Sequence, residues 1–284
     1  MYQIIERKML NFNTVMMAIE APRVAGKAEP GQFIILRTNE QGERIPFTVA
    51  DVDPDQGMVT IIFQEIGKTT KELGAMKAGD FILDFVGPLG KPSLLEGYKK
   101  VAVVAGGLGV AIAYPQAKKL KKFGVEVHFV AGFRNKELII LEDEAKAFSN
   151  LTVIATDDGS NGVKGFVTDA LRELLDAGNR YDVVIVIGPL PMMKFVSALT
   201  KEYDVKTIVS MCPVMIDGTG MCGGCRLTVG GEIKFACIDG PEFDGHQVDF
   251  DEAIRRQAYY KHKENISLES HQCRMEGMTN EKCG

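Results

Sequence analysis

The sequence predicts a β barrel plus α/β fold: an antiparallel barrel, then a Rossmann-like parallel-sheet domain, then a short loop domain near the C-terminus. Three observations support this fold class. Residues 1–97 contain short runs of Val, Ile, Phe and Thr between turn residues, a pattern typical of barrels and sandwiches. Residues 98–210 alternate apolar strands with amphipathic helices, which favours a parallel sheet covered on both faces. Four of the six cysteines fall between Cys212 and Cys237.

The individual elements follow from the same patterns. In the barrel we expect strands at 33–37, 47–50, 58–64 and 81–86, each bounded by Gly, Pro or Asp. In the α/β domain we expect strands at 101–105, 125–131, 151–155, 182–187 and 206–210. Helices are expected between them, ending near 123 and covering 136–148, 166–177 and 192–202. A polar helix over about 251–263 and a weakly apolar tail complete the chain.

Composition excludes several classes of protein. The 284 residues include 33 basic and 38 acidic side chains, a net charge of −5, so a nucleic-acid partner is not expected. The longest apolar stretch, 101–113, is shorter than the roughly 20 residues of a membrane span. The N-terminus MYQIIERKML has no signal-peptide core. We therefore expect a soluble, cytoplasmic protein with no membrane partner.

The cysteine spacing predicts a metal centre. The pattern Asp217-x4-Cys222-x2-Cys225-x11-Cys237 matches the spacing of plant-type [2Fe–2S] ferredoxins, with Asp217 in place of the first cysteine. A tight loop must bring backbone N–H groups toward the sulfides, and four glycines permit that: Gly218, Gly220, Gly223 and Gly224. The predicted ligands of a [2Fe–2S] cluster are therefore Asp217 and the three cysteines.

Alternatives remain open for these residues. Cys212, ten residues before Cys222, is the rival fourth ligand. A structural zinc site also uses Cys-x2-Cys, and buried free thiols are a third interpretation. In the tail, His271, Cys273 and Cys283 are expected to form a flexible end with free thiols, although binding or docking is the alternative.

Three further segments follow one another in a suggestive order. They are Arg44-Ile45-Pro46-Phe47-Thr48 at the start of an expected strand, Gly67-Lys68-Thr69-Thr70, and Gly106-Gly107-Leu108-Gly109 between a strand and a helix. A glycine loop in that position is the expected context for a pyrophosphate. Each segment alone is a weak signal, but their order is more specific.

On these motifs the chain resembles the ferredoxin–NADP reductase superfamily over about residues 3–248. It is most similar to electron-transfer subunits of class 1B dihydroorotate dehydrogenase, to sulfide dehydrogenase small subunits, and to the small subunit of NADH-dependent reduced ferredoxin:NADP oxidoreductase. The resemblance implies that FAD binds the barrel through Arg44, Pro46, Phe47, Thr48, Gly67, Thr69 and Thr70. Arginine suits the diphosphate because its guanidinium gives charge-assisted hydrogen bonds.

The resemblance also implies a site for NAD(H). It places the pyrophosphate on Gly106, Gly107 and Gly109, and the nicotinamide near Gly188 and Pro189. Many members have a cysteine before that glycine, where this chain has Ile187. Met192 and Met193, just beyond, are expected to pack in the core.

Two carboxylates bear on the choice of nucleotide. Asp157 and Asp158 follow the third expected strand of the α/β domain, where NADP-specific relatives place residues that hold the 2′-phosphate. At ~4 Å and an effective dielectric of about 20, one carboxylate would repel that phosphate by up to roughly 4 kcal/mol. A carboxylate accepts from ribose hydroxyls instead, so we predict NAD(H); solvated loop residues are the alternative.

The domains are therefore expected as an FAD-binding barrel (1–97), an NAD-binding domain (98–210), a [2Fe–2S] segment (211–248) and a C-terminal helix and tail (249–284). The four histidines fall in no catalytic triad spacing, which suits an oxidoreductase whose cofactors perform the chemistry. No residue is predicted to be catalytic in its own right.

Because no organic-substrate site is evident, the cluster is expected to face a partner subunit in a heterodimer. Aspartate at the first ligand position and Ile187 favour the ferredoxin:NADP oxidoreductase type. The resemblance then implies a larger iron–sulfur flavoprotein with [4Fe–4S] clusters and an NADP site, ferredoxin reached through that subunit, and electron bifurcation. The alternatives are a dihydroorotate dehydrogenase or sulfide dehydrogenase subunit and, from another class, a non-catalytic zinc-binding regulatory module.

Overall fold

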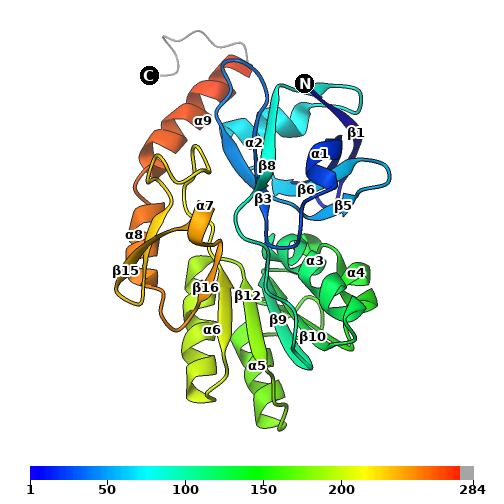
Figure 1. Cartoon of the computed structure of the whole chain (residues 1–284), viewed down its shortest axis with the longest axis vertical. Coiled ribbons are helices and arrows are strands. Elements are labelled where there is room, and N and C mark those ends of the chain that lie inside the picture. Colours follow the sequence, from blue (N-terminus) through cyan, green and yellow to red (C-terminus); the bar gives the residue numbers. More distant parts are fainter. Residues whose placement is uncertain (276–284) are drawn as a thin grey trace.

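The computed structural model of the chain describes residues 1–275, and its first part is an antiparallel barrel made of two sheets (Figure 1). The larger sheet has the order β5-β6-β2-β1-β7, and the smaller has the order β4-β3-β8. The strands are β1 (Tyr2–Met9), β2 (Thr14–Glu20), β3 (Phe33–Arg37), β4 (Ile45–Thr48), β5 (Asp51–Asp53), β6 (Met58–Gln64), β7 (Phe81–Ile82) and β8 (Asp84–Leu89). Helices α1 (Pro22–Ala25) and α2 (Lys68–Ala75) lie between them.

The predicted barrel strands are found with small shifts. Strands 33–37 and 58–64 match, the strand expected at 47–50 is β4 two residues earlier, and 81–86 divides into β7 and β8. Strands β1 and β2 were not predicted; polar residues interrupt the apolar pattern of β1, whereas residues 15–19 of β2 form a continuous apolar run that was overlooked. Their inward side chains nevertheless form the barrel core with β6, among them Ile4, Met17 and Phe63.

The second part is a six-stranded sheet with the order β11-β10-β9-β12-β13-β16. Strands β9 (Lys100–Gly106), β10 (Glu126–Phe133), β11 (Leu151–Thr156), β12 (Val183–Ile187) and β13 (Thr207–Ser210) are parallel. Its helices are α3 (Gly109–Lys122), α4 (Glu142–Ala147), α5 (Val167–Asp176) and α6 (Leu190–Glu202). Residues of α3 and α4 share one core with Val101 and Val103, and residues of α5 and α6 share another with Ala102 and Val104. Helices thus cover both faces, which confirms the predicted α/β class.

The helix predicted at 136–148 is broken. A single 3-10 turn, η1 (Lys136–Leu138), precedes α4. Between them the chain passes through Leu141, whose φ is +53°, and Ile140 is buried. The apolar run 138–141 therefore packs on the sheet across a break between two short helices, which a sequence pattern alone does not distinguish from one continuous helix.

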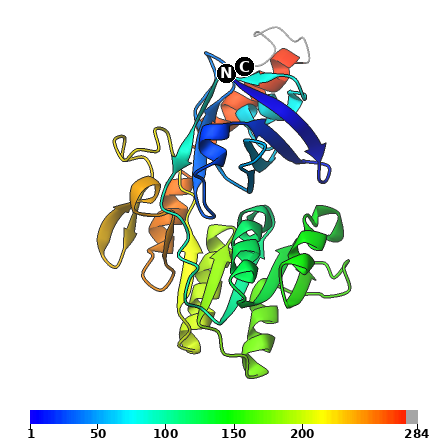
Figure 2. The same cartoon turned by 45° about the vertical axis from the view of Figure 1, so that its right-hand side comes forward.

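The cysteine-rich segment contributes a strand to the sheet of the second part. A hairpin of β14 (Arg226–Val229) and β15 (Glu232–Phe235) leads into α7 (Ala236–Asp239). Then β16 (Glu242–Asp244) pairs antiparallel with β13 at the sheet edge. The segment therefore lies beside both the barrel and the sheet, as Figure 2 shows. No strand was predicted in this segment, which was expected to be a loop.

Two helices follow, α8 (Phe250–Gln257) and α9 (Lys261–Met275), where one helix and a tail were expected. The expected flexible end is thus helical as far as Met275. Helix α9 reaches back to α2 of the barrel, where His271 Nδ1 lies 3.6 Å from Glu72 Oε1. Cys283 and the side chain of Cys273 lie outside the described residues. Within residues 1–275, none of the helices has the length and apolar character that a membrane crossing requires.

Candidate functional site

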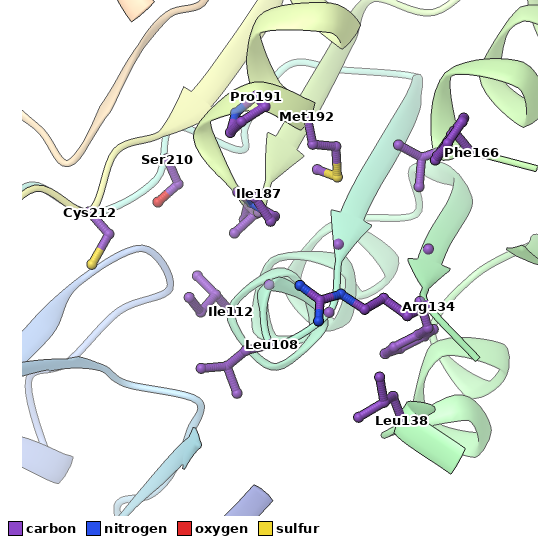
Figure 3. A pocket seen from close by; sticks show the side chains of 18 of the residues that line it. Leu108, Ile112, Arg134, Leu138, Phe166, Ile187, Pro191, Met192, Ser210 and Cys212 are labelled. Atoms are coloured by element: carbon purple, nitrogen blue, oxygen red, sulfur yellow. The ribbon is translucent and has the colours of Figure 1, made fainter. Parts of the chain in front are cut away.

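A cavity of about 1250 Å³ lies where the barrel, the sheet and the cysteine-rich segment meet (Figure 3). It is larger than the roughly 300–1,000 Å³ of most small-molecule sites. The barrel contributes Phe33, Pro46 and Thr48, and the cysteine-rich segment contributes Met211, Cys212 and Met215. The sheet contributes the carboxyl ends of its strands, which is where open α/β sheets bind ligands.

Gly106, Gly107 and Gly109, all predicted for NAD, line this cavity and form what we call the nucleotide loop (residues 106–109). Gly107 has φ of +54°, a conformation that glycine adopts without strain. A Cβ at Gly109 would lie 2.2 Å from the carbonyl oxygen of Ile187. The loop therefore needs glycine so that α3 can begin close against β12.

Gly188 and Pro189 also line the cavity, directly beside the nucleotide loop. A Cβ on Gly106 or Gly188 would meet the side chain of Met192 at 2.4 or 2.6 Å. Met192 thus packs between these two glycines and lines the cavity as well, whereas Met193 is buried in the core as expected.

The start of α3 suits an anion. The first turn of this 14-residue helix has no acidic residue, and helix N-termini present N–H groups and positive dipole ends to phosphates. Arg134, at the end of β10, points into the same cavity (Figure 3) and forms no ion pair with any residue of 1–275. Arg134 was not predicted as a site residue, although a basic residue at the carboxyl end of a parallel strand could have indicated it.

The two predicted aspartates lie in different surroundings. Asp157 lines the cavity. The Asp158 carboxylate instead accepts a hydrogen bond from the backbone N–H of Ser160 at 2.9 Å. Hydrogen bonds from Ser160 lower the pKa of Asp158, so this carboxylate stabilises its own turn. Only Asp157 is placed to meet a nucleotide directly.

The residues predicted for FAD divide in a similar way. Pro46 and Thr48 of β4 line the cavity. Phe47 points to the other side of that strand and packs on Phe63 in the barrel core, with ring centroids 5.3 Å apart. Arg44 is exposed, and its Nε donates to the carbonyl oxygen of Ile216 at 3.2 Å.

The second predicted FAD segment begins α2 and does not line the cavity. Gly67 precedes the helix, and its N–H donates to Thr70 Oγ1 at 2.9 Å. Thr69 is buried and its hydroxyl donates to Glu43. In this structure the two threonines therefore stabilise the start of the helix.

The four predicted cluster ligands lie in two pairs. Cys225 and Cys237 are buried, with their sulfur atoms 3.2 Å apart. Asp217 and Cys222 lie in one loop, where the N–H of Cys222 donates to Asp217 Oδ2 at 2.8 Å. Among the described side chains, which do not include that of Cys273, no three of His, Cys, Asp or Glu surround a single point as one metal ion would require. Two ligand pairs suit a cluster with two irons better than a single zinc ion.

This cluster loop, residues 216–225, depends on left-handed glycines at Gly218, Gly220 and Gly223. A Cβ at Gly218 would lie 2.6 Å from Ile35 and 2.8 Å from Leu89. The loop therefore rests directly on strands β3 and β8 of the barrel. Since β4 pairs with β3, the loop is close to the strand predicted to hold the flavin.

The protonation of the ligands follows from their surroundings. The N–H of Thr219 donates to Asp217 and, with that of Cys222, lowers the pKa of the carboxyl group, which favours an anionic ligand. Burial, with the Cys225 thiol as the next cause, raises the pKa of Cys237 to about 12. Thiolates at this position therefore need the positive charge of a metal.

Cys212, the rival ligand, lines the cavity and is not part of the cluster loop (Figure 3). It is open to the cavity yet surrounded by protein, which raises the pKa of its thiol.

Comparisons with known proteins agree with this division of the chain. Residues 213–249 match the iron–sulfur cluster binding domain of dihydroorotate dehydrogenase B, and residues 103–198 match the oxidoreductase NAD-binding domain. The first match contradicts the zinc-module alternative. Several solved structures share the fold at low identity, for example the ferredoxin reductase of carbazole 1,9a-dioxygenase (TM-score 0.59, 18% identity, 72% of this chain and 65% of that one).

The relatives are more specific. A Thermotoga maritima protein named as a homolog of the electron-transfer subunit of dihydroorotate dehydrogenase B is 49% identical over 88% of both chains. The electron-transfer subunit of that enzyme from Desulforamulus reducens is 35% identical over 83% of this chain and 92% of its own. A chain from the structure of NADH-dependent reduced ferredoxin–NADP oxidoreductase has a TM-score of 0.90 and 46% identity, covering 95% of this chain and 97% of its own.

The fold and the site together define an iron–sulfur oxidoreductase subunit of the ferredoxin reductase class, with an NAD-binding domain and a barrel whose fold indicates FAD. The chain belongs to the family of dihydroorotate dehydrogenase B-type electron-transfer subunits.

Proposed function

We propose that this chain is the small subunit of an NADH-dependent reduced ferredoxin:NADP oxidoreductase that bifurcates electrons. The observation that carries the proposal is the single cavity bordered by the barrel strand β4, the nucleotide loop and Cys212, next to the cluster loop. Flavin, when bound there, exchanges a hydride with the nicotinamide and single electrons with the cluster. The protein would hold the nicotinamide, the flavin and the cluster in this order.

Residues on both sides of the cavity would position the two nucleotides. Pro46 and Thr48 would contact the flavin, with Phe47 fixing their strand from the core. The FAD diphosphate would be bound by Arg44, Gly67, Thr69 and Thr70. The two threonines would bind it after their present hydrogen bonds rearrange. NAD(H) would be held by Gly106, Gly107, Gly109, Gly188 and Pro189. Asp157 would accept from ribose hydroxyls, with Asp158 supporting its turn, and Arg134 would face the nucleotide phosphates.

Asp217, Cys222, Cys225 and Cys237 would ligate a [2Fe–2S] cluster. The location of Cys212 in the cavity supports Asp217 as the fourth ligand. Aspartate is a harder ligand than thiolate, so we expect a more labile cluster or a shifted reduction potential.

Three exposed apolar side chains support a partner at the cluster. Ile216 precedes Asp217, Met221 precedes Cys222, and Ile238 follows Cys237, with exposed fractions of 53%, 88% and 44%. Exposed apolar groups beside a redox centre suit a docking surface. The proposed occupant is a larger iron–sulfur flavoprotein with an NADP site, through which ferredoxin would be reached.

The C-terminal helices favour this assignment. The ferredoxin–NADP oxidoreductase chain covers 95% of this chain, so the unmatched residues are fewer than those in the segment 250–284. The match therefore includes part of residues 250–284. A subunit that shares this extension is expected to share the complex.

The test is to add NADH anaerobically to the purified full chain and to record the flavin absorbance and the electron paramagnetic resonance spectrum. Bleaching of the flavin together with a reduced-cluster signal is expected. A flavin that bleaches while the cluster signal stays absent even with dithionite would contradict the electron route. The native complex identifies the partner: a partner chain without a second pyridine-nucleotide site would overturn bifurcation.

The second candidate is an electron-transfer subunit of dihydroorotate dehydrogenase, favoured by the family match of residues 213–249. It predicts NADH formation that depends on dihydroorotate once the catalytic subunit is added. A sulfide dehydrogenase subunit would instead show sulfide- or polysulfide-dependent turnover.

A further inference from the structure

Helix α8 lies beside the hairpin and α7 of the cluster segment (Figure 1), just beyond the residues that match the iron–sulfur domain. Phe250 at its start is buried in the same core as Cys225 and Cys237. Lys194 of α6 bonds Asp251 at 2.7 Å, and the N–H of Asp249 donates to the carbonyl of Thr228. The helix is therefore fixed with respect to the buried ligand pair.

One side chain of this helix reaches the cluster loop. Arg256 Nη2 donates to the carbonyl oxygen of Gly224 at 3.2 Å. Gly224 lies between two proposed ligands, and its own N–H points to the sulfur of Cys222 at 3.4 Å. Holding the Gly224 carbonyl therefore restrains the backbone of a residue whose N–H meets a ligand sulfur.

The alternative partner of Arg256 is not used. Glu252 stands four residues earlier on α8, a spacing at which Glu and Arg usually pair. Within residues 1–275, however, no carboxylate lies within ion-pair distance of Arg256, and one buried oxygen of Glu252 has no hydrogen-bond partner. The half-buried guanidinium thus directs its charge to the cluster loop.

We infer that Arg256 is a positioning residue of the iron–sulfur centre, which holds the turn between Cys222 and Cys225 and raises the reduction potential of the cluster. Reduction adds one negative charge to an already anionic group, and a nearby cation stabilises that product more than the oxidised form. Hydrogen bonds to ligand sulfur act in the same direction. This inference rests on the proposed function, because it needs a cluster in this loop.

Arg44 holds the opposite side of the loop, through the carbonyl that precedes Asp217. It is exposed where Arg256 is half-buried, so solvent screens its charge more strongly. Arg44 also belongs to the proposed FAD site, which would confound a test. Arg256 is outside that site and gives the cleaner experiment.

The experiment is a potentiometric titration of the cluster in the full-length protein, followed by electron paramagnetic resonance, for wild type, Arg256→Gln, Arg256→Lys and Arg255→Gln. Arg255→Gln is the matched control, since it removes the same charge from the neighbouring position of the same helix, which is exposed. Arg256→Gln should change the ratio of reduced to oxidised cluster at a fixed potential by about tenfold, a decrease of roughly 59 mV for one electron. The reduction potential of Arg256→Lys should lie between those of wild type and Arg256→Gln. The potential of Arg255→Gln should match that of wild type.

The remaining outcomes are also decisive. If Arg256→Gln fails to retain iron while Arg255→Gln and Arg256→Lys retain it, the positioning role is supported. If Arg256→Gln keeps the wild-type potential, or if both glutamine variants shift it equally, the inference is overturned and the proposed function stands. Wild-type protein without iron and sulfide would overturn both.

Discussion

The nucleotide loop follows a strand that is hydrogen-bonded on both sides, β10 on one and β12 on the other. The cluster loop does not directly follow a strand, and the hydrogen bonds that shape it include those to its own carboxylate and those from two arginines that are distant in sequence. The first is shaped by the sheet before any ligand arrives. The second has two ligand pairs that a metal must join.

This difference suits two kinds of cofactor. A nucleotide that enters and leaves in each cycle benefits from a preformed site, because little conformational entropy is lost on binding. A resident cluster contributes its own binding free energy to the fold of its loop. The four tests below probe this contrast, beginning with the largest expected effect.

Removal of a buried ligand should affect the cluster loop alone. Cys225→Ser or Cys237→Ser should abolish the iron–sulfur absorbance and the acid-labile sulfide, while NADH binding stays unchanged. Cys212→Ser is the control and should retain iron. Loss of iron from Cys212→Ser, with retention in Cys237→Ser, would reverse the ligand assignment.

Overpacking should affect the nucleotide loop. Gly109→Ala places a methyl group 2.2 Å from the Ile187 carbonyl, and we expect a loss of about 2–3 kcal/mol in the free energy of unfolding. The control is Gly26→Ala, where φ is −72° and the new Cβ meets only the Pro22 oxygen at 3.4 Å. It should stay within about 1 kcal/mol of wild type. Equal urea midpoints for the two variants would show that the loop is less rigid than we infer.

The two aspartates give a smaller effect on specificity. Asp157→Ser should raise the preference for NADPH, measured as the ratio of kcat/KM values, by about tenfold because a carboxylate facing the 2′-phosphate is removed. Asp158→Ser should change the ratio little, since that carboxylate is bonded to its own turn. A larger effect from Asp158 would invert the assignment.

Acid should weaken the sheet itself, by the smallest effect of the four. His128 is buried in β10, with Nδ1 2.9 Å from the Tyr181 hydroxyl and Nε2 3.0 Å from Glu126. Burial, followed by the charge of Lys100, lowers the pKa of His128 below its ordinary 6.5. The folded state therefore binds fewer protons than the unfolded state, so stability is full above about pH 6.5 and falls as the pH drops toward the depressed value. His128→Gln should reduce this dependence in urea titrations between pH 7.5 and 5, and parallel curves would contradict it.

Local patterns were sufficient for the parallel sheet and the nucleotide loop. Buried strands such as 101–105 and the glycines after them carry their environment in their own sequence. A candidate set of cluster ligands could be proposed for the same reason, because Asp217, Cys222 and Cys225 lie in one continuous loop and Cys237 follows within the same cysteine-rich segment.

Contacts between distant segments could not be predicted. Arg44 meets Ile216 across 172 positions, and Arg256 meets Gly224 across 32. The pairing of β16 with β13 and the return of α9 to α2 likewise depend on how separate elements pack. The face of β4 on which Phe47 lies is a further case, because side chains alternate along a strand and the core contact with Phe63 puts Phe47 on the opposite face from Pro46 and Thr48.

The strand β16 has a mechanical consequence. Because it extends the sheet from within the cysteine-rich segment, the proposed nicotinamide site and the proposed cluster loop are anchored to one sheet, and the cluster loop also rests on β3 and β8 of the barrel. A movement of the barrel relative to the sheet would change the spacing from flavin to nicotinamide and, through β3 and β8, would also shift the cluster loop. A single movement would then affect hydride transfer to the flavin and electron transfer to the cluster. A partner subunit that binds both the barrel and the sheet would control these two steps together.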